Sequence, residues 1–123
     1  MDPARVYARV AARLPDSIEI DGERLTHEVL VALAHRLRPD EAAELGAELP
    51  DELADILGRA NGDGRLDRDE LIEDIAVRLD LDDEDAETAL LVVLRVIRRT
   101  LEPLVTFDQI LESLPPDLAQ LMQ

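Results

Sequence analysis

The sequence predicts an all-α protein that folds as a single compact helical bundle over residues 1–123. Three observations predict it: apolar residues recur at helical spacing, residues that favour helix starts stand before those stretches, and prolines follow several of them. The core is expected to consist of Leu, Val, Ile and Ala, because Tyr7 and Phe107 are the only aromatic residues. A chain of 123 residues favours one domain.

Two longer segments predict the helices of the first half. One begins at Asp2, an N-cap residue followed by proline, and carries an apolar stripe at helical spacing to Leu14. The other, over about 23–38, is apolar nearly all round in its middle (VLVALA), as a central, buried helix requires. Pro39 stops this helix, and Pro50 opens a short one.

The second half repeats this order. A helix over 67–79 opens with a capping box, and a helix over about 84–102 is again apolar nearly all round (ALLVVL). Two short helices are expected after it, and their starts are marked by Thr106 and by Pro115 or Pro116. The two central helices are expected to pack against each other.

The segment IEIDGE (18–23) is the one exception to the helical pattern. It alternates like a strand and contains Asp-Gly, which is a turn signal. A short extended arm is therefore an alternative for these residues.

The two halves are similar enough to predict a duplication. DPARVYARVAARL aligns with DRDELIEDIAVRL, HEVLVALAHRLRP with LVVLRVIRRTLEP, and LPDELADIL with LPPDLAQLM. Identical residues recur in each pair, and most other positions keep apolar with apolar. The sequence thus predicts two tandem helical repeats of about 60 residues, each with two longer and two short helices. They are expected at 1–58 and 66–123, joined by a linker at 59–65.

This order of segments resembles a bacterial family named for its unknown function, domain of unknown function 2267. The residues that carry the resemblance are DELIEDIAVRL, DAETALLVVLRVIRRTLEP, LPDELADIL and LPPDLAQLM. The resemblance covers essentially the whole chain. It implies an all-helical bacterial protein, and it supplies no catalytic residue or ligand.

The charge of the chain restricts its partners. Asp and Glu number 29 against 13 basic residues, all of them Arg, for a formal net charge of −16. Because such a field repels phosphate groups, we expect neither nucleic acid nor an anionic membrane as a partner. A basic protein surface or a cation would be attracted.

No compartment signal is evident. The chain has no cysteine, which excludes disulfides and thiolate metal sites. Its first residues lack the apolar core of a signal peptide, and no apolar run approaches the roughly 20 residues of a membrane span. A cytoplasmic protein is therefore expected.

The segment RANGDGRLDRDE (59–70) resembles an EF-hand calcium loop. With Gly64 at the sixth position, oxygen ligands fall on four side chains: Asn61, Asp63, Asp67 and Glu70. Arg59 stands at the first position, where the loop requires an acidic ligand, so any calcium site would be weak. The alternative is a linker in which Asn-Gly and Asp-Gly make turns and the acidic residues cap the following helix.

Six arginines form two candidate surfaces for a partner: Arg5, Arg9 and Arg13 on the first helix, and Arg95, Arg98 and Arg99 on the second central helix. Internal pairing with the protein's own carboxylates, for instance on the helix over 67–79, is the expected arrangement. A binding face for an acidic partner is the alternative.

No pattern for catalysis is present. His27 and Glu28 begin an H-E-x-x-H pattern, but Val31 occupies the position of the second histidine, so both His27 and His35 are expected to be structural. There is no Ser-His-Asp set, no Gly-rich phosphate loop and no basic-aromatic patch. The sequence therefore favours a non-enzymatic helical interaction or scaffolding module without a cofactor, which binds another protein or itself. A weak calcium-responsive protein is the alternative.

Overall fold

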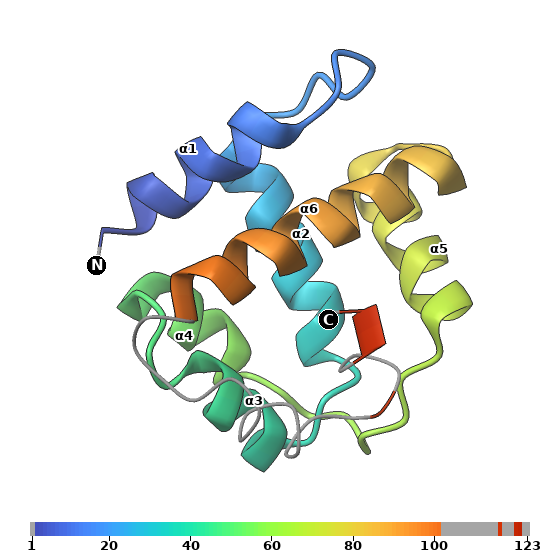
Figure 1. Cartoon of the computed structure of the whole chain (residues 1–123). Helices are drawn as coiled ribbons and strands as arrows, with labels where there is room; N and C mark the ends of the chain where they lie inside the picture. The colour runs from blue at the N-terminus through green and yellow to red at the C-terminus, as the bar shows by residue number, and fades with distance from the viewer. Residues whose placement is uncertain (1, 102–115, 117–119, 122–123) are drawn as a thin grey trace.

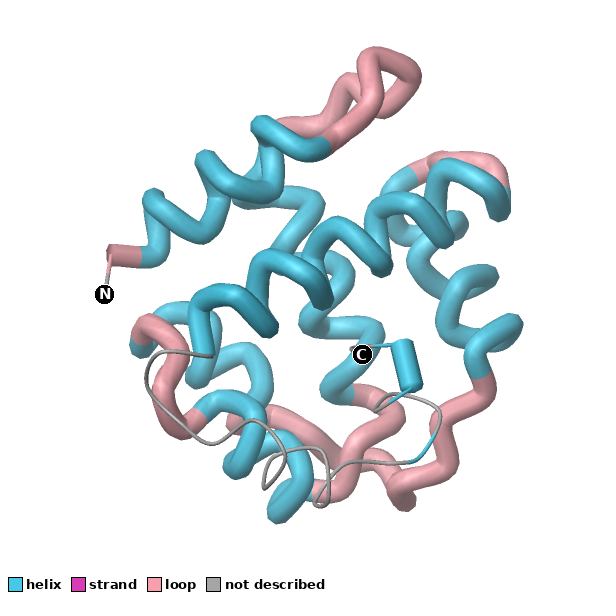
Figure 2. The backbone as a smooth tube through the Cα atoms, in the orientation of Figure 1, coloured by secondary structure: helices cyan, strands magenta, loops and turns pink. Residues whose placement is uncertain are grey.

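A computed structural model describes residues 2–101, 116 and 120–121. Six helices have defined bounds: α1 (Pro3–Arg13), α2 (Gly22–Ala34), α3 (Pro39–Gly46), α4 (Asp51–Leu57), α5 (Arg68–Leu79) and α6 (Asp83–Leu101). The described ranges contain no strand, which confirms the all-α class (Figure 2). The short helix predicted at 106–113, and most of the last one, lie outside the described residues.

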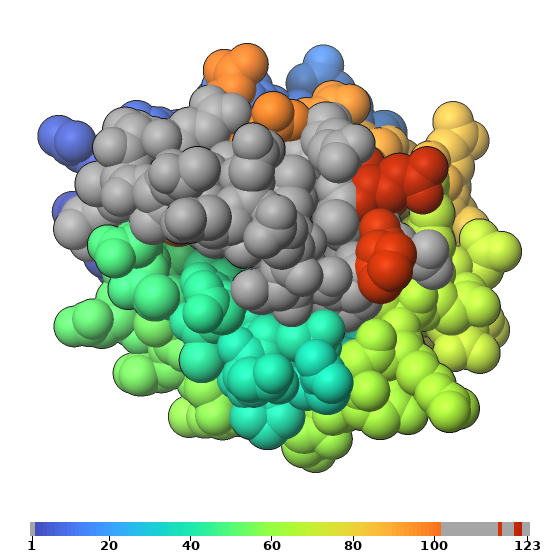
Figure 3. Space-filling model, turned by 60° about the horizontal axis from the view of Figure 1, so that its bottom comes forward, coloured from blue at the N-terminus to red at the C-terminus, as the bar shows by residue number. Residues whose placement is uncertain are grey.

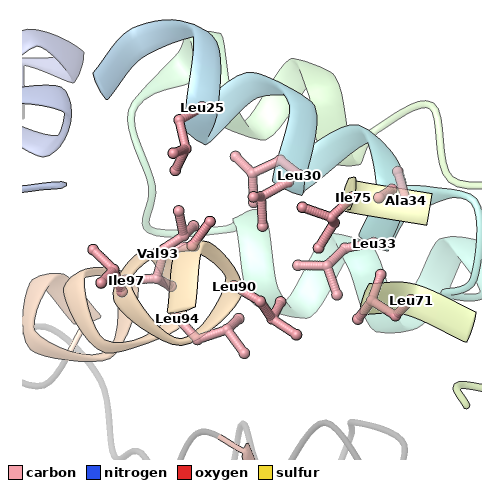
Figure 4. Packing of buried hydrophobic residues seen from close by; sticks show 14 of the residues in the cluster. Leu25, Leu30, Leu33, Ala34, Leu71, Ile75, Leu90, Val93, Leu94 and Ile97 are labelled. Carbon is pink, nitrogen blue, oxygen red and sulfur yellow. The ribbon is translucent and has the colours of Figure 1, made fainter. Parts of the chain in front are cut away.

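Helix α2 is the centre of the bundle. It contacts α1, α4, α5 and α6, and α6 crosses it (Figure 1). Its side chains pack with those of α5 and α6 in one core, where Leu30, Leu33 and Leu94 are fully buried (Figure 4). This arrangement confirms that both apolar helices are central and pack against each other, because a helix with neighbours on all sides needs apolar residues on all sides.

Helix α2 ends at Ala34, four residues before the predicted end. The residue before a proline avoids the helical conformation, and Arg38 is accordingly extended, with φ −70° and ψ 154°. Pro39 therefore does more than stop α2, since it occupies the first position of α3. Glu41 supports this start, because its carboxylate accepts a hydrogen bond from the backbone N–H of Arg38 at 2.9 Å.

Aspartates cap four helices. The carboxylates of Asp2, Asp21, Asp67 and Asp82 accept hydrogen bonds from backbone N–H groups in the first turns of α1, α2, α5 and α6, at 3.0, 3.0, 3.1 and 2.8 Å. The alternative of an extended arm over 18–23 is wrong at its end, because Asp21 is the N-cap of α2 and the helix begins at the next residue. The Asp-Gly pair there is an N-cap followed by the first residue of a helix, and Gly22 lies against the backbone of α1.

Thr26 carries a buried hydroxyl that has no hydrogen-bond partner within the described part of the chain. An unpaired buried hydroxyl loses its hydrogen bonds to water without replacement. We expect Thr26→Val to raise the free energy of unfolding in urea by about 1 kcal/mol. Thr100→Val is the matched control, because the buried Thr100 hydroxyl donates to the Val96 carbonyl at 2.9 Å. Equal gains in the two variants would contradict the expectation.

Candidate functional site

The segment over 59–70 is fastened to the end of α2. Three of its backbone N–H groups donate to carbonyls there: Asn61 to Ala34 at 3.3 Å, Gly62 to Leu37 at 2.9 Å, and Gly64 to Arg36 at 3.2 Å. A Cβ atom at Gly62 would lie 2.4 Å from the carbonyl carbon of Arg36, so only glycine allows this approach. The segment also lies beside α3, as Figure 3 shows from below. It therefore satisfies carbonyl groups that the end of a helix leaves without partners.

The predicted calcium ligands have separate roles in this segment. Asp67 caps α5, and the Asp63 carboxylate accepts a hydrogen bond from the N–H of Arg65 at 3.0 Å. Asp63, Asp67 and Glu70 do not form a group of converging carboxylates within the described residues. Gly64 does have a positive φ of 83°, which suits the sharp turn of a calcium loop. Calcium binding by this segment stays a prediction.

A shallow hollow of about 640 Å³ adjoins the segment and includes Asp63 and Glu70 in its lining. Ion pairs lie beside it. Asp74 of α5 lies 2.8 Å from Arg36, which follows α2, and 3.0 Å from Arg78 of α5, and Arg78 lies 3.5 Å from Glu28 of α2. Because these two arginines and two carboxylates balance in charge, their role is to join α5 to α2 and to the residues after it.

A different cluster joins α1, α2 and α4. The Tyr7 hydroxyl lies 2.6 Å from His27 Nε2, and the two rings meet edge to face with centroids 5.3 Å apart. The same His27 nitrogen lies 3.5 Å from a carboxylate oxygen of Glu52. Glu23 stands one turn before His27 on α2. Ligand atoms of Glu23, His27 and Glu52 all lie within 4.8 Å of one another, the single such group among the described residues.

The environment of Tyr7 keeps its phenol protonated. Burial raises the pKa of Tyr7 well above its ordinary value of 10.0. A hydrogen bond with Glu52 and the negative charges of Glu52 and Glu23 raise the pKa further. The cluster therefore offers a neutral phenol, an imidazole and two carboxylates in one partly exposed place.

The sequence did not predict this cluster. His27 was expected to be structural, and Tyr7, Glu23 and Glu52 were not candidate site residues. One local signal was present, because Glu23 and His27 are four residues apart and share a helix face. The contributions of α1 and α4 required the tertiary packing.

The arginine candidates divide into two groups. Five are exposed and, in the described ranges, make no ion pair; they are called the arginine face below and comprise Arg5, Arg9, Arg13, Arg95 and Arg99. Arg98 is half-buried and is therefore not included in this set. The expected pairing with the helix over 67–79 is wrong for the arginine face, because Asp74 of that helix pairs with Arg36 and Arg78 instead.

The two parts of the arginine face lie on α1 and α6, which are in contact. The Ser17 hydroxyl donates to Asp85 at 3.4 Å, so the end of α1 lies beside the start of α6 and the two helices run antiparallel. Tyr7 and Ala11 mark the flank of α1 that faces α2, because both lie against Gly22. The arginines of α1 lie on the opposite flank of that helix. Arg95 and Arg99 lie on the exposed side of α6. Five exposed arginines on two helices in contact thus stand on a protein of net charge −16.

None of the described helices is long and apolar enough to cross a membrane. Comparisons with curated proteins and with solved structures found no match. A family model described as "Uncharacterized conserved protein (DUF2267)" matches residues 4–121. This match includes all six helices except the first residue of α1, and the residues it covers include the cluster and the arginine face. The chain belongs to the DUF2267 family.

Proposed function

We propose that this protein is a non-enzymatic interaction module that binds an acidic surface of another protein, or of a second copy of itself, through the arginine face. The observation that carries the proposal is that, among the described residues, these five arginines make no ion pair, although the chain has 29 acidic residues. Arginine is enriched at protein-binding hot spots because its planar group makes several directed hydrogen bonds. A cytoplasmic location is part of this proposal.

The two-repeat organisation is a further part of the proposal. In each half a shorter helix precedes a longer, more buried one: α1 before α2, and α5 before α6. Under this view the arginines of α1 and α6 come from different repeats, and the duplication brings them onto one surface.

Affinity capture with matched variants tests the function. The face variant carries Arg5→Gln, Arg9→Gln and Arg95→Gln, while the control variant carries Arg24→Gln, Arg59→Gln and Arg65→Gln. All six arginines are exposed, so both variants lose the same charge from the surface. We expect a partner that the wild type and the control variant capture and the face variant does not. Equal capture by all three would contradict the proposal.

Sedimentation velocity decides whether the partner is a second copy. If it is, the wild type and the control variant form a dimer at low salt that the face variant does not form. The dimer should weaken as salt rises, because the Debye length falls to about 10 Å at 0.1 M. A dimer that forms equally in the face variant would show that another surface mediates self-association.

Calcium response is a second candidate function, favoured by the positive φ of Gly64 within the EF-hand pattern. It predicts that calcium raises the melting temperature at fixed ionic strength, because an ion that binds only the folded state stabilises it. Asp63→Ala should abolish this rise, whereas Asp69→Ala, which removes an exposed carboxylate of α5, should keep it. If Asp63→Ala responds to calcium like the wild type, the segment over 59–70 is not the site.

A further inference from the structure

We propose that Glu23, His27 and Glu52 bind one divalent transition-metal ion, with zinc as the representative, beside the hydroxyl of Tyr7. This site is separate from the arginine face and does not depend on it. The three side chains come from two helices, α2 and α4, and α1 closes the site with Tyr7. Figure 1 shows α1 and α4 on the same side of α2, as this convergence requires.

The spacing of the ligand atoms fits such an ion. Two ligands that share a tetrahedral zinc at about 2.1 Å lie roughly 3.4 Å apart. His27 Nε2 and the Glu52 oxygen are 3.5 Å apart. The third ligand, Glu23, lies within 4.8 Å of both, and its exposed side chain can close the remaining distance by rotation. Little rearrangement of the helices is therefore needed.

The donor set selects the class of metal. One imidazole nitrogen with two carboxylate oxygens suits zinc and its first-row neighbours, whereas calcium takes six to eight oxygen ligands and magnesium a near-ideal octahedron. Three protein ligands also leave one tetrahedral position open, which a water molecule or a partner side chain can fill. The site therefore differs from the calcium hypothesis in place and in chemistry.

The histidine nitrogen that faces the cluster is the one that would bind the ion. His27 Nε2 makes the close contacts with Tyr7 and Glu52, so a bound metal ion would replace these contacts at the same atom. The groups that face this ring are Tyr7 from α1, Glu23 from α2 and Glu52 from α4.

Nuclear magnetic resonance of the wild-type chain locates the ion without any variant. The chain has two histidines and one tyrosine, so the ring protons of His27, His35 and Tyr7 are separate reporters. With one equivalent of zinc, we expect the signals of His27 and Tyr7 to shift and those of His35 to remain. Because His35 lines the hollow with Asp63 and Glu70, a shift of His35 alone would place the metal near the 59–70 segment and overturn the proposal. So would the absence of any saturable shift.

Zinc titration calorimetry on variants tests the ligands one by one. Loss of a residue that only orients a metal ligand lowers metal affinity by roughly 10- to 100-fold. His27→Gln and Glu52→Gln each remove a ligand, so each should weaken zinc binding by more than this. The matched controls are His35→Gln and Glu48→Gln, which change the same residue types on exposed positions outside the cluster and should bind like the wild type. Circular dichroism checks that each variant folds. Unchanged affinity in folded His27→Gln would overturn the proposal.

Discussion

Leu94→Ala is expected to lower the free energy of unfolding by about 2–5 kcal/mol. Leu94 is fully buried on α6, where α6 packs against α2 and α5 (Figure 4). The substitution removes apolar contact and leaves a cavity that a core bounded by three helices cannot close. Urea unfolding followed by circular dichroism measures the change.

Leu91→Ala is the matched control for this prediction. It makes the same chemical change on the same helix, so the intrinsic helix propensity changes equally in both variants. Leu91 is only half-buried, and we expect its loss to cost about 1 kcal/mol. Equal losses of unfolding free energy at the two positions would show that the face of α6 that carries Leu94 is not in the core.

Gly22→Ala is expected to destabilise the protein by roughly 3 kcal/mol, the upper end of the usual range for overpacking. A Cβ atom at Gly22 would lie 2.2 Å from the carbonyl oxygen of Tyr7. Because the obstructing atom belongs to the backbone, α1 must move away from α2. That movement also separates Tyr7 from His27, so the loss of stability should accompany a loss of their contact.

Gly46→Ala is the opposite case within the same chain. The nearest atoms to a Cβ atom at Gly46 lie at 3.5 Å, which is ordinary van der Waals contact. Alanine favours the helical conformation over glycine, so we expect this variant to gain up to about 1 kcal/mol. Thermal melts of the two variants should therefore shift in opposite directions. A melting temperature of Gly22→Ala equal to or above that of the wild type would contradict the packing of α1 on α2.

Local sequence signals predicted most of the helices. The caps at Asp2 and Asp67 and the apolar middles of α2 and α6 depend on residues close together in the chain, and the structure has them as predicted. The end of α2 was misplaced because two signals compete there. The apolar pattern continues to Leu37, but Pro39 imposes an extended conformation on the residue before it.

Longer-range features could not be predicted. Asp21 and Gly22 have the composition of a turn, and only the approach of α1 explains why glycine opens a helix there. The arginines of α1 were expected to pair with α5, yet α1 packs on α2 and α6. The Tyr7, His27 and Glu52 cluster needs three helices that are distant in sequence to converge.

The orientation of α1 is the central claim, because it places both Tyr7 beside the metal ligands and the α1 arginines of the arginine face. The same rotation that turns Tyr7 toward His27 and Glu52 turns the arginines of α1 to the opposite flank. A rotated α1 would take Tyr7 away from His27 and Glu52 and would redistribute the arginine face.

Titration of Tyr7 by its ultraviolet absorbance tests this orientation most directly, because it is the only tyrosine and the chain has no tryptophan. Since the folded-state pKa is raised, the folded phenol should remain protonated at pH 10, where a free tyrosine is half ionised. The associated stability is fully present below pH 10 and is lost as the pH rises above it. Half ionisation near pH 10 in a protein that circular dichroism shows to be folded would contradict the account.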